Sequence, residues 1–138
     1  MRFDRLNNVT GWAVWAAATL VYFLTVEPTA SFWDCGEFIA SAYKLEVGHP
    51  PGAPFFMLLA RFLMIPMSPE NAAFAANGLS VLSSSFTILF LFWSITHLAK
   101  RLLGEEQPEG GSAAAVLGAG AIGALAYTFS DSFWFSAV

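Results

Sequence analysis

The chain has 138 residues, of which 57% are hydrophobic and only 12% are charged, and its mean hydropathy is +0.60. Soluble domains have about half apolar and about a quarter charged residues, so this composition excludes an ordinary soluble domain. The net charge of −4 argues against a nucleic-acid-binding surface, and the single cysteine excludes both an internal disulfide framework and a cysteine-based zinc site.

The first apolar segment, residues 9–26, is long enough to cross a bilayer as a helix. Two arginines precede it, so we expect the N-terminus in the cytoplasm and the following segment outside. A cleaved signal peptide is the alternative. It is disfavoured because the apolar run is longer than the usual signal-peptide core of about 7–15 residues, and because the small-residue cleavage pattern is poor.

An external loop is predicted over residues 27–54. Within it, Asp34 to Val47 has the pattern of a short amphipathic helix lying in the interface plane, which Gly48 would end. Residues 54–65 are apolar but too short to cross the bilayer, so we expect a half-inserted interfacial helix. The alternative for this segment is a short, tilted transmembrane span.

Two further spans are predicted. A long helix starts at Ser68 and Pro69 and ends before Gly104, and its residues 79–98 would cross inwards, because a basic pair follows them. A cytoplasmic loop at 104–112 leads to the outward span at 113–129. This last span has small residues every four positions, which would form a packing face for another helix: Ala115, Ala119 and Gly123.

The third span also contains the string G-x-G-x-x-G. A dinucleotide site needs a strand before this string and a helix after it, whereas here the string lies inside one apolar run. We therefore do not interpret it as a cofactor site.

The expected architecture is a single all-α integral membrane region over residues 1–138. It has about three transmembrane helices, one external amphipathic helix and one half-inserted helix. The chain stops at Val138, directly after the aromatic run Phe133 to Phe135, so we expect it to be the N-terminal part of a longer protein. We expect the bacterial inner membrane, although the lone cysteine is equally compatible with the endoplasmic reticulum.

Asp34 and Glu37 are the first candidate site residues. Their spacing places both on one helix face. They could form a capping box at the helix start. Alternatively, one of them could be a general base that accepts the proton of a substrate hydroxyl. Both interpretations remain open from the residues alone.

His49 lies before a stiff elbow formed by Pro50, Pro51 and Gly52, because proline keeps the chain extended and glycine allows a bend. It could be a simple turn residue, or it could hydrogen-bond a phosphate, a sugar or one of the two acids. Together with those acids it could also bind a divalent metal, but the spacing matches no recognised metal motif, so no metal or other cofactor is assigned.

Two more charged residues are candidates. Arg61 lies in the apolar half-helix and could hold a lipid phosphate, or it could extend to the interface as an ordinary membrane arginine. Asp131 follows the third span. It could be a further acid on the external face or the N-cap of the next helix.

Three segments together carry a family resemblance: Trp33 to Phe38, Leu45 to Pro54, and Phe129 to Val138. They resemble the DUF2723 family of multi-spanning proteins, which includes the TMEM260-like protein O-mannosyltransferases. The pairing of D-x-G-E with H-P-P-G is the specific part, and the resemblance covers essentially the whole chain.

The resemblance implies an enzyme similar to GT-C glycosyltransferases, which use a polyprenyl-phosphate sugar and an acid in the first external loop. Asp34 would be the catalytic base and Glu37 the second acid, while His49 and the elbow would shape the donor or acceptor pocket. Arg61 would steady the leaving phosphate.

We therefore expect transfer of a sugar, with mannose as the candidate, to a protein hydroxyl on the external face. The partners would be the bilayer, the donor lipid, the acceptor protein and the remaining helices of a longer chain. Three spans cannot enclose a lipid-linked sugar, so the 138 residues alone should be inactive. The alternative is a non-enzymatic helical membrane module that binds lipid or a partner protein. A transporter fragment is disfavoured, because most polar groups lie outside the spans.

Overall fold

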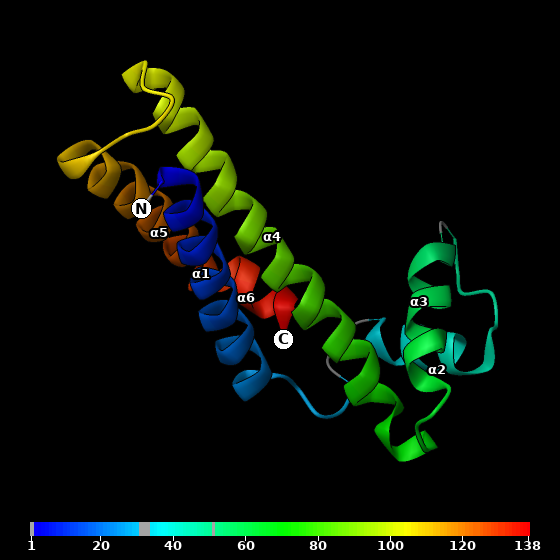
Figure 1. Ribbon diagram of the computed structural model, residues 1–138. Helices are drawn as coiled ribbons and strands as arrows, with labels where there is room; N and C mark the ends of the chain where they lie inside the picture. The colour runs from blue at the N-terminus through cyan, green and yellow to red at the C-terminus, as the bar shows by residue number, and fades with distance from the viewer. Residues whose placement is uncertain (1, 31–33, 51) are drawn as a thin grey trace.

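The computed structural model describes residues 2–30, 34–50 and 52–138. These residues form helices and connecting turns and contain no strand, which confirms the all-α prediction for this part of the chain. The elements are α1 (Phe3–Thr25), α2 (Cys35–Lys44), α3 (Pro54–Met64), η1 (Pro69–Asn71), α4 (Ala72–Leu103), α5 (Gly110–Thr128) and α6 (Asp131–Ala137). Figure 1 shows α4 as a long rod with α1, α5 and α6 along one half and the α2–α3 hairpin at the other end.

Among the described residues, two helical segments are long and apolar enough to cross a membrane: Pro69–Leu103, which joins η1 to α4, and Gly110–Thr128, which is α5. They contain or overlap the predicted second and third spans. Helix α1 covers nearly all of the predicted first span but is not among the helices that are long and apolar enough by the same measure. A count of three spans therefore stays a prediction.

The larger hydrophobic core lies where α1, α5 and α6 meet α4. Its buried members come from all four helices: Val14, Ala18, Tyr22, Val81, Ile88, Phe92, Ala124 and Ala137. Gly120 makes the close contact between α5 and α4, since a Cβ atom there would lie 2.6 Å from Cγ2 of Thr96 and 2.9 Å from the Phe92 ring. A missing side chain thus sets the separation of these two helices.

The face of α5 that packs against α4 lies one residue along from the predicted small-residue face. Ala115 and Ala119 are exposed, whereas the buried face of α5 contains Val116, Gly120, Ala124 and Thr128. The period of four was right, but the bulky Phe92 ring of α4 requires a glycine opposite it, and Gly120 fills that position. Gly123 also faces α4, where a Cβ atom would meet Ile95.

A smaller core joins the α2–α3 hairpin to the first turns of α4. It consists mostly of alanine and methionine: Ala42, Met57, Ala60, Met64, Ala72, Ala75 and Ala76. Small side chains allow the three helices to approach closely, and flexible methionines fill the irregular gaps between them. The α2–α3 hairpin is therefore attached to α4 by packing as well as by the chain.

Helix α2 is shorter than predicted. It ends at Lys44 instead of Val47, and Leu45 adopts the left-handed conformation with φ of 56°, so Gly48 does not end the helix. The amides of Leu45 and Glu46 bond to the carbonyls of Ala42 and Ser41, which completes a C-terminal cap without glycine. At α4, by contrast, Gly104 ends the helix with φ of 70°, as predicted.

Hydrogen bonds hold the helices together at the end of the bundle nearest the hairpin. The Tyr22 hydroxyl donates to the Thr128 carbonyl at 3.2 Å, and the Asn77 side chain donates to the carbonyls of Glu27 and Thr29 at 2.7 and 3.0 Å. Asn77 thereby fixes the linker that leads from α1 to the predicted site. The sequence did not single it out.

Candidate active site

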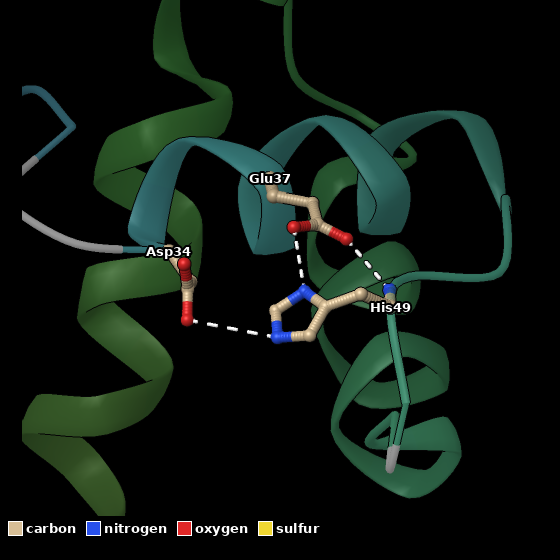
Figure 2. Close-up of polar contacts among 3 residues, drawn as sticks. All are labelled: Asp34, Glu37 and His49. Carbon is tan, nitrogen blue, oxygen red and sulfur yellow. Dashed lines mark hydrogen bonds and ion pairs between the residues drawn. The ribbon is translucent and has the colours of Figure 1, made fainter.

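Asp34, Glu37 and His49 lie together on the α2–α3 hairpin (Figure 2). The backbone N–H of His49 donates to Oε1 of Glu37 at 2.7 Å, and Nδ1 of the ring lies 2.7 Å from Oε2 of the same carboxylate. The other ring nitrogen, Nε2, lies 3.7 Å from Oδ2 of Asp34. The histidine therefore lies between the two acids that the sequence singled out.

The start of α2 places both acids. Asp34 occupies the N-cap position, but its side chain makes no capping hydrogen bond. Glu37, three residues later, bonds to His49 and not to the helix start. The capping-box interpretation is therefore wrong, and both carboxylates face the loop that follows the helix.

Gly48 allows that loop to approach Glu37. A Cβ atom at Gly48 would lie 3.2 Å from Oε1 of Glu37, which is closer than most such contacts, so a larger residue would push the loop away. The early reversal of the chain at Leu45 directs this segment back along α2. Gly48 was expected only to end the helix, although its place directly before His49 is the signal that could have identified this role.

The elbow after His49 contains a bend, as the sequence predicted. The amide of Gly52 donates to the carbonyl of His49 at 2.9 Å, and Gly52 has φ of 67°, a conformation that favours glycine. Pro50 is exposed. Pro51, also a predicted site residue, lies outside the described residues.

The three charged groups change one another's protonation. The backbone N–H of His49, together with its ring, lowers the pKa of the Glu37 carboxyl below its usual 4.5. The hydrogen bond and the charge of Glu37, followed by the charge of Asp34, raise the pKa of His49 above its usual 6.5. Their pairing favours an ionised Glu37 and a protonated His49.

Asp34 is the most accessible of the three groups. Its side chain is 63% exposed, compared with 49% for His49 and 40% for Glu37. It also borders a cavity of about 330 Å³ between α2, α3 and α4. The walls of this cavity are largely apolar: Cys35, Phe38, Ile39, Phe56, Ala76, Asn77 and Ser80. A carboxylate at the edge of an apolar cavity could meet a ligand with both polar and apolar parts.

The other two charged candidates lie elsewhere. The Arg61 guanidinium donates to the Tyr43 carbonyl and lies 5.4 Å from the centroid of the Tyr43 ring, so it connects α3 to α2. Asp131 is exposed and is the first residue of α6, whereas Ser130 takes the N-cap position that the sequence offered to Asp131. The predicted roles of Arg61 and Asp131 at a site stay predictions.

Residues 34–138 match the family described as the protein O-mannosyl-transferase TMEM260 N-terminal domain. The chain belongs to this family. The match begins at Asp34 and includes Glu37 and His49, so the three clustered residues all lie within the TMEM260 N-terminal domain.

Two curated relatives carry the same name. The chain is 33% identical over 87 residues to protein O-mannosyl-transferase TMEM260 of Mus musculus, which covers 63% of the chain and 12% of that protein. It is 30% identical over 81 residues to its counterpart from Dictyostelium discoideum, covering 57% of the chain and 10% of that protein. The chain thus matches about a tenth of each relative's length. No solved structure matches it.

Proposed function

We propose that this chain is the N-terminal part of a membrane glycosyltransferase of the TMEM260 family. The complete enzyme would move a sugar, with mannose as the candidate, from a polyprenyl phosphate to a protein hydroxyl on the external face. Family membership and the names of the relatives support transfer to protein. The observation that carries the proposal is the cluster of two acids and one histidine within the family's matched region.

Asp34 is the proposed general base. Both oxygens of Glu37 are engaged by His49, whereas Asp34 makes no capping hydrogen bond and is the more exposed acid. An ionised, accessible carboxylate can accept the proton of an acceptor hydroxyl as the new glycosidic bond forms. Glu37 and His49 would hold the loop in position beside it.

The proposed membrane arrangement places α1, α4 and α5 across the bilayer and the α2–α3 hairpin outside. Support comes from the two apolar helices and from α3, whose exposed apolar side chains suit half-insertion into the outer leaflet: Phe55, Leu58, Leu59 and Phe62. The polyprenyl chain would then approach the apolar cavity beside Asp34 from the membrane side.

The test is transfer activity of the complete protein carrying Asp34→Asn, with a polyprenyl-phosphate sugar and an acceptor protein. General bases contribute about 10²–10⁴-fold to rate, so we expect a loss in that range. Glu46→Gln is the matched control. Glu46 is an exposed acid of the same hairpin that pairs with Lys44 at 3.8 Å, and its loss should leave activity unchanged.

Retention of full activity by a folded, membrane-inserted Asp34→Asn protein would reject Asp34 as the base.

The alternative function is a helical membrane module without catalysis. One observation supports it: the exposed face of α5 at Ala115 and Ala119, which another helix could cover. That alternative predicts no transfer by the unsubstituted protein with any polyprenyl-phosphate sugar.

A further inference from the structure

His49 and Asp34 face each other without a hydrogen bond between them. The 3.7 Å that separates Nε2 of His49 from Oδ2 of Asp34 is too long for a hydrogen bond. It suits two ligands of one metal ion, since a nitrogen and an oxygen that each lie about 2.0–2.2 Å from an ion are usually about 3–4 Å apart. The two atoms face each other across this gap in Figure 2.

Glu37 completes an arrangement that is typical of metal-binding histidines. Such a histidine binds the metal through one ring nitrogen and donates the N–H of the other to a carboxylate or carbonyl, which fixes the tautomer and the orientation of the ring. Here Nδ1 of His49 lies 2.7 Å from Glu37, while the His49 backbone N–H binds the second oxygen of the same carboxylate. Nε2 is left directed at Asp34.

We propose that Asp34 and His49 bind one divalent cation and that Glu37 positions the His49 ring for it. One imidazole nitrogen and one carboxylate oxygen suit an ion that accepts both, such as Mn²⁺. The three groups offer ligand atoms within 4.8 Å of one another, and their side chains are accessible to solvent.

Two protein ligands leave several coordination positions to water or to an incoming anion. An ion bound through Oδ2 of Asp34 would leave Oδ1 available to the acceptor hydroxyl, and the ion could bind a phosphate oxygen of the sugar donor. This inference rests on the proposed function for the identity of that anion, but not for the ion site itself. Binding of the ion to His49 would displace any proton on Nε2.

The test is titration of the complete, chelator-treated protein in detergent with Mn²⁺, without donor or acceptor, followed by electron paramagnetic resonance. We expect one saturable ion per chain and a nitrogen coupling from imidazole. Asp34→Asn and His49→Gln should each weaken binding at least about tenfold, and His49→Gln should abolish the nitrogen coupling. Glu37→Gln should weaken binding about 10–100-fold, as is usual for a carboxylate that orients a metal-binding histidine.

Glu46→Gln again serves as the control and should leave Mn²⁺ affinity unchanged. Glu37→Asp, which keeps the carboxylate, should recover part of the affinity that Glu37→Gln loses. The absence of saturable binding, or binding that neither Asp34→Asn nor His49→Gln weakens, would overturn the proposal. Because the assay contains no donor, an Asp34→Asn protein that loses transfer while the unsubstituted protein binds no Mn²⁺ would refute the ion site and leave the proposed function intact.

Discussion

The geometry of the cluster assigns different tasks to two acids that look equivalent in the sequence. Glu37 uses both carboxylate oxygens on one residue, His49, whereas Asp34 contacts only the far side of the ring and remains accessible. A carboxylate held by two hydrogen bonds is a poor base, because those bonds stabilise its ionised form. The same bonds make it a good anchor for a loop.

The first residue-scale prediction concerns the protonation of His49. In metal-free protein its pKa should lie above 6.5, and Glu37→Gln should return it towards that value. The contribution of His49 to loop stability is complete below pH 6.5 and is lost as pH rises through its raised pKa. The contribution of Glu37 is present above pH 4.5 and is lost as pH falls through its lowered pKa.

An NMR titration of selectively labelled histidine in the chelator-treated protein would measure this shift. High salt should reduce the shift, since all three side chains are partly exposed. An unshifted His49 in low salt would contradict the observed pairing with Glu37.

The sequence identified the residues of the cluster but not how they pair. D-x-G-E and H-P-P-G pointed to Asp34, Glu37 and His49, and the elbow with its bend was predicted from proline and glycine. Which acid contacts the histidine depends on where α2 ends. Leu45 ends it in a conformation that side chains rarely adopt, and no residue pattern marks that position. Gly48 was assigned to the end of the helix, so its role in allowing the loop to approach Glu37 was missed.

At the scale of elements, α5 shows that a periodic pattern fixes the spacing of a helix face but not its direction. Small residues recur every four positions on more than one side of this helix, so alanine and glycine alone could not select the buried side. Helix α4 determines which side of α5 is buried, because it places Phe92 and Thr96 where only Gly120 leaves room.

Gly120→Ala should therefore destabilise the contact between α4 and α5, whereas Gly118→Ala should not. A Cβ atom at Gly120 would lie 2.6 Å from Thr96, while nothing lies within 4 Å of one at Gly118. Overpacking typically costs about 1–3 kcal/mol, and alanine in an open helix position gains up to about 1 kcal/mol over glycine.

Thermal unfolding of the two variants of the complete protein in the same detergent would test this difference. Gly120→Ala should unfold at a lower temperature than the unsubstituted protein, and Gly118→Ala at the same temperature or a higher one. Equal unfolding temperatures for the two variants would mean that α5 does not pack against α4 through Gly120.

At the scale of the whole molecule, the helices arrange polar groups at two opposite ends. At one end, Asp4 contacts Lys100 at 3.7 Å and Gln107 at 2.7 Å, which brings the start of α1 to the loop between α4 and α5. The other end carries the α2–α3 hairpin (Figure 1). This separation supports the proposal that the first end is cytoplasmic and the second external.

Cysteine labelling of the complete protein tests this topology, in a background where Cys35 is the only cysteine. Cys35 lies on the hairpin and is partly exposed, so a membrane-impermeant maleimide should label it from the outside of intact cells. A cysteine introduced by Glu106→Cys, after Cys35→Ser, should be labelled only when the membrane is opened. The reverse pattern would invert the proposed orientation.

Helix α4 belongs to both hydrophobic cores. It contributes Ala72, Ala75 and Ala76 to the hairpin side and Val81, Ile88 and Phe92 to the bundle side. Each residue of an α-helix advances it by about 1.5 Å and turns it by about 100°. One extra residue between Ala76 and Val81 would thus swing Asp34 and its neighbours around the rod by more than a quarter of a circle. The length of this short segment therefore sets the direction in which the hairpin, and with it the proposed base, faces the rest of the enzyme.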